Sequence, residues 1–337
     1  MRKRVWRSAR TSTRHSAGTA GRNPWRTIAA GGLALLLTAC GARPAHTGPL
    51  TVVHVAALPV VDDAPLYIAR QKGLFRAEGL DVKIKTIAQS TLAVPGLLNG
   101  TIDIVGGANY VSFFQAAARK VLDVQIVADA YQTTSGVAAV LTMPDERDKI
   151  RDPRDLQGKK VAFSLLKSVT TMTFDESMRA HDVDPTKVDH VEVAFPQMAA
   201  ALKSHSVDAA YMVEPFITAA QEKLGAREVL DPVTGPTNQW PMSGYISTRK
   251  WTDAHPQAAA AFQRAMFRAQ AQTRRADVEK ILPTYSKINR RTAAVITLGT
   301  YPSSISATRL RRVEDLMYRS GMLPHHLDVD ALIYRAH

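Results

Sequence analysis

Apolar and polar positions alternate along this chain in two different periods, and the segment from Thr51 to Lys85 contains both. A β-branched, almost continuously apolar run indicates a strand covered on both faces, and a helical pattern closed by Gly73 follows it. The segment divides into a strand at 51–57, a loop at 58–64, a helix at 65–72 and a second strand from 80. Such a βαβ unit places its first loop at the carboxyl end of a strand, where open α/β sheets bind ligands. We therefore expect functional residues in the loop Leu58–Asp63.

The same alternation of strand and helix patterns continues towards the end of the chain. Further strands are predicted at 102–105, 124–128, 136–143, 160–163, 188–193, 207–212 and 243–249. Further helices are predicted at 90–100, 110–119, 169–180, 197–204, 257–275, 276–285, 291–298 and 307–320. Pro95 should kink or shorten the first of these helices. The alternation favours an α/β fold, and 337 residues are enough for two lobes with separate cores.

Two parts of the sequence repeat one design. The spacing from Leu97 to Asp103 equals the spacing from Leu202 to Asp208, and a short apolar strand follows each time. Two lobes of one design that face each other are the architecture of a hinged binding protein. We interpret Asp103 and Asp208 themselves as turn or capping residues rather than ligand contacts.

The net charge of +13 would indicate a nucleic-acid partner if it were spread over the whole chain. It is concentrated instead, because residues 1–39 contain eight of the 43 basic residues and no acidic one. The remaining 35 basic residues face 30 acidic ones, which leaves a net charge of +5. The arginine-rich helices near the end of the chain are interpreted as solvated surfaces. We expect no nucleic-acid partner.

The basic start of the chain is typical of a secretory signal. A positive region precedes an apolar core at 28–37, and small residues lead to Cys40. This core is too short to span a membrane as a stable helix. The tetrad Leu37–Cys40 resembles a bacterial lipobox, which predicts a signal peptide at 1–39 and a lipid on Cys40. The alternative is an unprocessed anchor with an incidental cysteine. Residues 40–49 are interpreted as a flexible tether, and the single cysteine excludes an internal disulfide.

Sequence signatures of catalysis are missing. No group of His, Cys and carboxylate residues has metal-ligand spacing, and neither a nucleophile elbow nor a phosphate-binding loop motif occurs. The pair His325 and His326 lies in a terminal loop and is interpreted as surface. We therefore expect no metal, no cofactor and no enzymatic activity.

Four short motifs carry a resemblance to a known family. Tyr67–Ala69, Lys72–Phe75 and Glu78–Val82 resemble the periplasmic-binding-protein family that serves nitrate, sulfonate, taurine and thiamine-pyrimidine ABC transporters. Asp155–Phe163 resembles the segment that opens the second lobe in such receptors. Fungal pyrimidine synthases share the fold, but they use a cysteine-rich motif that a chain with one cysteine lacks.

The resemblance implies a type II periplasmic-binding fold, in which two lobes joined by hinge crossovers close on a ligand like a Venus flytrap. Lobe I would comprise 50–135 and 242–337, and lobe II would comprise 136–241. The protein would be a monomeric, extracytoplasmic, lipid-anchored receptor that passes a small molecule to an ABC permease and its ATPase. An exported enzyme or a ligand-presenting sensor lipoprotein on the same fold is a second alternative.

The candidate ligand contacts lie in loops that follow predicted strands or precede predicted helices. Asn109 is expected to cap the helix that starts at Tyr110. Gly106 and Gly107 would let the backbone approach a ligand closely, or would form a plain tight turn. The proposed contacts are Pro59, Asp62, Asp63, Asn109, Tyr110, Tyr131, Ser164, Ser168, Thr170, Phe195, Glu214, Pro215 and Tyr245.

The charge of these loops favours one class of ligand. Their acidic residues are Asp62, Asp63, Asp129 and Glu214, and Lys167 is the only basic residue nearby. Like-charge repulsion disfavours a free anion, and the aromatic residues of the same loops could stack on a ring. We therefore predict an amino-pyrimidine or another amino-bearing or cationic aromatic molecule. The alternative is an anion site built from backbone N–H groups, with Asp62 and Asp63 merely capping a helix.

Overall fold

The computed structural model describes residues 48–146 and 149–336. The predicted signal peptide at 1–39, Cys40 and most of the predicted tether lie outside these ranges. Within them the chain forms two mixed five-stranded sheets. No helix in the described part has both the length and the apolar character that a membrane span requires.

The first sheet has the strand order β2-β1-β3-β10-β4. Its strands are β1 (Thr51–Ala57), β2 (Leu80–Thr86), β3 (Ile104–Asn109), β4 (Val124–Gln132) and β10 (Pro241–Thr248). β1 runs parallel to β2 and β3, whereas β10 is antiparallel to both β3 and β4. We call this sheet and the helices that cover it lobe I.

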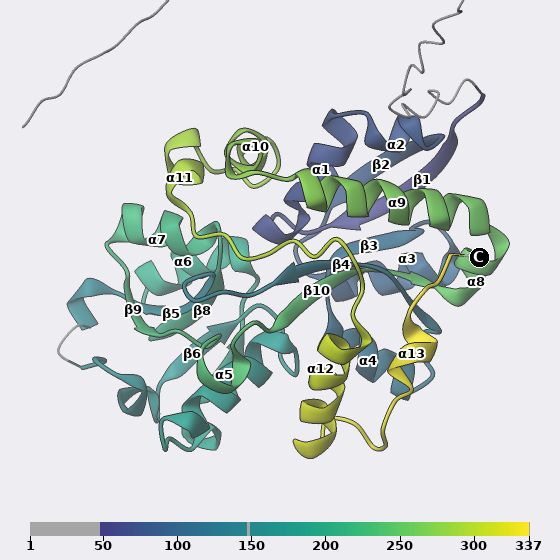
Figure 1. The fold of residues 1–337 in the computed structure, drawn as a ribbon. Helices are drawn as coiled ribbons and strands as arrows, with labels where there is room; N and C mark the ends of the chain where they lie inside the picture. The colour runs from purple at the N-terminus through teal and green to yellow at the C-terminus, as the bar shows by residue number, and fades with distance from the viewer. Residues whose placement is uncertain (1–47, 147–148, 337) are drawn as a thin grey trace, which may run out of the picture. The chain divides into compact units, whose positions relative to one another are not determined.

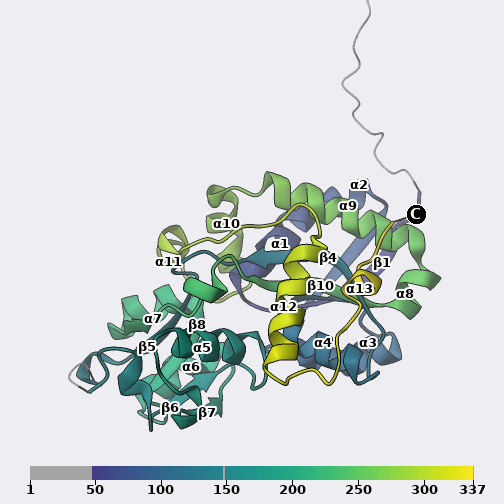
Figure 2. The same ribbon diagram turned by 60° about the horizontal axis from the view of Figure 1, so that its bottom comes forward.

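Helices cover both faces of the first sheet (Figures 1 and 2). One face carries α1 (Ala64–Gln71), α2 (Leu74–Ala77) and α9 (Pro256–Gln272). The other carries α4 (Tyr110–Ala118) and α12 (Ala307–Arg319). Further helices of this part are α3 (Val94–Asn99), α8 (Arg249–Ala254), α10 (Arg275–Ile281), α11 (Arg290–Val295) and α13 (Val329–Leu332). Because both faces are covered, almost every residue of β3, β4 and β10 is buried.

The second sheet repeats the first, with the order β7-β6-β8-β5-β9. Its strands are β5 (Ala138–Thr142), β6 (Lys160–Phe163), β7 (Asp189–Glu192), β8 (Ala209–Val213) and β9 (Arg227–Leu230). β6 is parallel to β7 and β8, and β5 is antiparallel to β8 and β9. Its helices are α5 (Val169–Ala180), α6 (Phe195–Lys203) and α7 (Phe216–Leu224). We call this part lobe II.

The predicted internal repeat is confirmed in atomic detail. Asp103 Oδ2 accepts a hydrogen bond from the backbone N–H of His54 at 2.7 Å, and Asp208 Oδ2 accepts one from Lys160 at 2.7 Å. In each lobe this aspartate fastens the start of one strand, β3 or β8, to its parallel neighbour, β1 or β6. Neither aspartate lines the pocket between the lobes. The interpretation of both as structural residues is confirmed.

Most predicted elements are present, with four corrections. The helix predicted at 90–100 is a 3-10 turn, Ser90–Ala93, followed by α3, because Pro95 fits only the first turn of a helix. β3 begins later than predicted and continues through both glycines to Asn109. β8 likewise begins at Ala209 rather than Val207. Five short elements were not predicted, because their patterns are no stronger than those of a loop: α2, α7, α8, α13 and β9.

Candidate functional site

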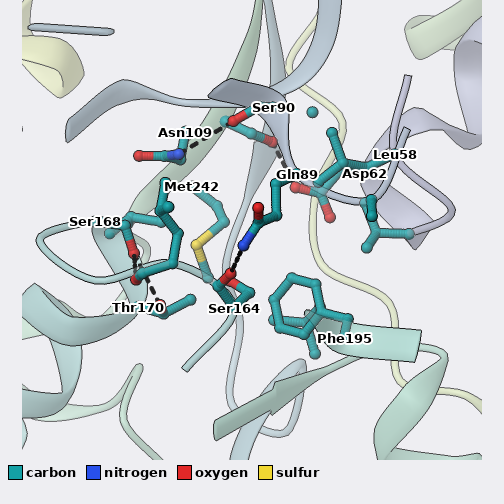
Figure 3. A pocket seen from close by; sticks show the side chains of 17 residues that line it. Leu58, Asp62, Gln89, Ser90, Asn109, Ser164, Ser168, Thr170, Phe195 and Met242 are labelled. Carbon is teal, nitrogen blue, oxygen red and sulfur yellow. Dashed lines mark hydrogen bonds between the residues drawn. The ribbon is translucent and has the colours of Figure 1, made fainter. Parts of the chain in front are cut away.

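A small pocket of about 50 Å³ lies between the lobes, where the carboxyl ends of strands from both sheets meet. Of the predicted contacts, its lining includes Asp62, Asn109, Ser164, Ser168, Thr170 and Phe195. Figure 3 shows Asp62 and Phe195 on one side of this space and Asn109, Ser168 and Thr170 on the other. Gly107 also lines it. The pocket therefore combines groups that are far apart in the sequence.

Lobe I contributes a carboxylate and an amide. Asp62 is 6% exposed, and its Oδ2 accepts a hydrogen bond from the Ser243 hydroxyl of β10 at 2.5 Å. Asn109 Oδ1 accepts from the backbone N–H of Ser112 at 2.9 Å, so it caps α4 as predicted. The Asn109 amide also donates to the Ser90 hydroxyl at 3.2 Å. These bonds fix the orientation of both polar side chains at the pocket wall.

Lobe II contributes the start of α5. The backbone N–H of Ser168 donates to Thr171 Oγ1 at 3.0 Å, and the hydroxyls of Ser168 and Thr170 lie 2.9 Å apart. The first backbone N–H groups of a helix have no partner within the helix. A helix start also carries a partial positive charge. Ser168 is the N-cap residue of this helix.

A glutamine from lobe I connects the two sides of the pocket. The Gln89 amide donates to the carbonyl oxygen of Ser164 at 2.5 Å and to Glu192 Oε1 at 3.1 Å. Both acceptors belong to lobe II, at the carboxyl ends of β6 and β7. Gln89 is therefore a polar link that closes one wall of the pocket (Figure 3).

The electrostatics of the pocket depend on Asp62. Burial raises the pKa of this carboxyl group to about 6, although the Ser243 hydroxyl acts in the opposite direction. The described residues that line the pocket include no other acidic residue and no Lys or Arg. Asp62 is thus charged for most of the time at neutral pH and has no cationic partner at the pocket surface.

The neighbouring Asp63 faces away from the pocket and is fully buried. Its Oδ2 accepts from the backbone N–H of Leu58 at 2.9 Å. A Cβ atom at Gly106 would lie 2.5 Å from Asp63 Oδ1, so the glycine makes room for this carboxylate rather than for a ligand. Burial, reinforced by the nearby charge of Asp62, raises the pKa of Asp63 well above its usual range. Although Asp63 occupies the N-cap position of α1, its side chain makes no capping bond.

Two more predicted contacts, Tyr110 and Tyr245, are fully buried in lobe I and do not line the pocket. The Tyr110 hydroxyl donates to Asp129, whose other oxygen pairs with Arg309 at 2.6 Å. This pairing offsets the charge of Asp129, which was predicted to contribute to the charge of the ligand site. Tyr245 packs against the space that Gly106 leaves open. Both tyrosines belong to the core because strands β3, β4 and β10 are covered on both faces.

The remaining predicted contacts serve the connection between the lobes or line another cavity. Glu214 is 1% exposed and accepts from the Thr218 hydroxyl at 2.7 Å and from the backbone N–H of Thr297 at 3.1 Å. The Tyr131 hydroxyl accepts from the backbone N–H of Gly299. Pro215 starts the turn into α7, outside the pocket lining. Pro59 lines a separate groove.

Four lining residues of the pocket were not among the predicted contacts: Gln89, Ser90, Met242 and Ser243. Gln89 and Ser90 follow the carboxyl end of β2, so the rule applied to other strand ends would have found them. Met242 and Ser243 come from β10 and reach the pocket only because β10 inserts between β3 and β4. No local pattern signals that insertion.

Comparison with known proteins identifies related chains. Residues 61–276 match the model of the NMT1/THI5-like family. The nitrate/nitrite binding protein NrtA of Synechococcus elongatus is 29% identical over 245 residues, which cover 65% of this chain and 54% of NrtA. YtlA of Bacillus subtilis is 23% identical over 210 residues, 61% of each chain. The chain thus spans less than two thirds of these sequence relatives.

The fold comparison agrees with the family match. The periplasmic aliphatic sulphonate binding protein SsuA of Escherichia coli superposes with a TM-score of 0.67 at 18% identity. The match covers 85% of this chain and 98% of SsuA. The predicted two-lobed α/β fold of periplasmic binding proteins is therefore confirmed.

Proposed function

The chain belongs to the NMT1/THI5-like family, and from this premise we propose that it is a solute-binding receptor of an ABC importer. The pocket between two similar lobes supports this function, because a ligand there would be enclosed from both sides. Lobe I would comprise residues 50–135 and 242–337, and lobe II residues 136–241. The permease and the ATPase of the importer would be its partners.

We propose an amino-bearing or cationic small molecule, such as an amino-pyrimidine, as the ligand. One observation carries this choice: Asp62 is a carboxylate without a cationic partner among the described residues of the pocket wall. A ligand N–H group would pair with this carboxylate. The amide and hydroxyl groups of Asn109, Gln89 and Ser168 would bind the other polar groups of the ligand. Phe195 would contact a ring.

The size of the pocket sets a condition on this ligand. One water molecule occupies about 10–15 Å³ of cavity volume. The cavity of about 50 Å³ therefore holds only a few water-sized groups. A ring-sized molecule therefore requires the lobes to lie further apart than they do in this structure. Ligand entry would then involve the hinge motion that the fold permits.

An anion receptor is the second candidate, and the start of α5 favours it. The start of a helix and the Ser168 and Thr170 hydroxyls form an arrangement that binds anions in many proteins. The nitrate/nitrite binding protein NrtA is similar in sequence, and the aliphatic sulphonate binding protein SsuA shares the fold. This candidate requires that the charge of Asp62 be tolerated or removed by protonation.

The pH dependence of binding distinguishes the two candidates. The Asp62 carboxyl has a pKa of about 6, so an amine should bind more tightly as the pH rises from 5 to 7.5. An anion should bind more weakly over the same range, because Asp62 becomes charged.

We would measure thermal stabilisation by aminopyrimidines, taurine, alkanesulfonates and nitrate. A ligand at 100 times its Kd adds about 2.7 kcal/mol of stability, which is easily detected. Asp62→Asn should abolish amine binding. Asp175→Asn is the matched control, because burial raises the pKa of Asp175 to about 6 as well but this residue lies outside the pocket. Stabilisation by sulfonates or nitrate alone would refute the amine assignment.

We further propose that the protein is exported and held at the membrane by a lipid on Cys40, which lies outside the described residues. The basic segment, the apolar core and the tetrad that ends at Cys40 support this localisation. Cys40→Ser should move the protein from the membrane fraction to the soluble fraction after cell lysis. Unchanged membrane association would contradict the proposal.

A further inference from the structure

A second and larger cavity lies beside the pocket. It is a groove of about 530 Å³, within the range of small-molecule sites. Its walls come from the end of β2, from α6 and α7, and from residues 285–288 between α10 and α11. Figure 1 shows α6, α7 and α11 close together on the lobe II side. The groove shares only Ala88 with the lining of the pocket.

The rim of this groove is cationic. Lys203 of α6, Lys223 of α7 and Lys287 line it, and all three are exposed. No acidic residue is among the described residues of its wall. The structure gives none of these three ammonium groups a carboxylate partner in the described ranges, although it pairs many other basic residues. Positive charge without counter-charge in a concave site raises the local concentration of anions.

The floor of the groove is apolar and aromatic. Phe216 lines the groove and stacks on Phe195 of the pocket wall, with ring centroids 5.9 Å apart and planes inclined by 13°. Tyr285 also lines the groove and stacks on Tyr67, with ring centroids 3.9 Å apart. Ile87 and Ile288 complete this surface. Stacked rings are rigid, so the floor is a firm surface for a flat apolar group.

We propose that this groove binds a soluble organic anion that has a flat apolar body and a negatively charged head. The body would lie on Phe216, Ile87 and Ile288, and the head would contact the lysine rim. The two aromatic rings of Phe216 and Phe195 separate the groove from the pocket, so the groove is a second site with a ligand of its own. This inference does not depend on which ligand the pocket takes.

Dansylglycine, a fluorescent aromatic carboxylate, is the probe for this site. It should bind the full-length protein at neutral pH with a rise in fluorescence, and binding should weaken as salt is added. Dansylamide has the same rings without the carboxylate and should bind about tenfold more weakly. Sodium sulfate at equal ionic strength, which lacks an apolar body, should displace dansylglycine no better than sodium chloride does.

Two triple variants with equal charge change test the role of the lysines. Lys203→Ser, Lys223→Ser and Lys287→Asn together should weaken dansylglycine binding about tenfold. Asparagine is used at position 287 because the φ of +57° there suits it. Lys120→Asn, Lys187→Ser and Lys250→Ser together are the control, and Lys120 has the same left-handed backbone, with φ +55°. The control should change binding less than about twofold.

A filling variant tests the cavity itself. Ala200→Trp places an indole in the groove from the exposed side of α6 and should abolish dansylglycine binding. Asp62→Asn, a pocket variant, should leave it unchanged. Near-ultraviolet circular dichroism would verify that each variant is folded. An equal loss in both triple variants, retained binding in Ala200→Trp, or no dansylglycine binding at millimolar concentration would overturn the proposal.

Discussion

Asp62 and Asp63 are adjacent in the sequence, but their carboxylates point to different surroundings. Asp62 ends at the pocket wall beside Ser243, whereas Asp63 is enclosed beneath Gly106 and holds the backbone of Leu58. Each of the two carboxylates is too buried to be well solvated, and burial raises the pKa of both. The proposed ligand contact is therefore one carboxylate rather than the predicted pair.

Asp62→Asn should stabilise the protein without ligand at neutral pH. The folded-state pKa of about 6 lies above the ordinary value of 3.8, so the folded state binds more protons between these values. The contribution of the protonated Asp62 carboxyl to the free energy of unfolding is fully present below pH 3.8 and is lost as the pH rises through 6. Asparagine removes this loss, and the gain at pH 7.5 should reach about 3 kcal/mol at most. Urea unfolding at pH 7.5 and pH 4.5 should show the larger gain at pH 7.5.

Asp175→Asn provides the comparison for this measurement, because burial also raises the pKa of Asp175 to about 6. It should give a gain with the same pH dependence while leaving ligand binding intact. Equal stability of Asp62→Asn and the parent protein at pH 7.5 would contradict the assigned pKa.

At the scale of elements, strand ends and helix starts form the polar part of the pocket. β3 runs directly into α4 at Asn109, and α5 follows its N-cap residue Ser168 a few residues beyond β6. These short connections bring helix starts and their capping residues to the strand ends. The two glycines of β3 leave room for the Asp63 carboxylate, because a Cβ atom at either position would clash with it.

Gly106→Ala should destabilise the protein by about 2 kcal/mol or more, because overpacking of a buried site costs 1–3 kcal/mol. The new Cβ atom would lie 2.5 Å from Asp63 Oδ1 and 2.9 Å from Tyr245 Cε1. Gly158→Ala is the control, since it adds a methyl group in open space at φ +74° and should cost only the backbone strain of about 1–2 kcal/mol. Urea unfolding curves would measure both. A cost for Gly106→Ala below that of Gly158→Ala would argue against the close packing of Asp63.

Asn109→Ala should cost about 1 kcal/mol, the usual value for a lost N-cap. Asn109→Asp keeps the acceptor for the Ser112 N–H and should stay within a few tenths of a kcal/mol of the parent protein. The aspartate also adds a carboxylate to the pocket, so it should tighten binding of an amine and weaken binding of an anion. Urea unfolding would measure the effect of each variant on stability, and calorimetric titration would measure its effect on ligand affinity.

At the scale of the described molecule, a small set of bonds ties the lobes together near the pocket. The backbone N–H of Val61 in lobe I donates to the carbonyl oxygen of Glu214 at 3.2 Å. The side chain of Glu214 in turn accepts from the backbone N–H of Thr297. Two residues further on, the backbone N–H of Gly299 donates to the Tyr131 hydroxyl of β4. Glu214, predicted as a ligand contact, is thus placed where it can influence the angle between the lobes.

Glu214→Ala should loosen this connection. It leaves the backbone N–H groups of Thr297 and Thr218 without their partner, which should cost about 1–3 kcal/mol. The distribution of distances between the lobes should become broader. Electron spin resonance with labels at Lys120→Cys in lobe I and Lys187→Cys in lobe II, on a Cys40→Ser background, would measure it. Glu228→Ala, an equal truncation within lobe II, should leave the distribution as it is.

The sequence by itself determined the order of most elements, the repeat of one design in two lobes, and the cap at Asn109. Each of these depends on patterns within about a dozen residues, such as a period of two or 3.6, a proline or a capping side chain. The family motifs added the fold class. Short elements such as α7 and β9 were not predicted, because the sequence pattern of each is too short to distinguish it from a loop.

Only the tertiary structure decided which of these residues meet. Asp62 and Ser243 form one hydrogen bond across 181 positions of sequence, and this bond exists because β10 inserts between β3 and β4. The same packing buries Tyr110 and Tyr245 and pairs Asp129 with Arg309. Side-chain direction and burial follow from contacts between distant segments. The predicted acidic cluster therefore reduces to one carboxylate in the pocket, and the cationic groove beside it became visible only in the fold.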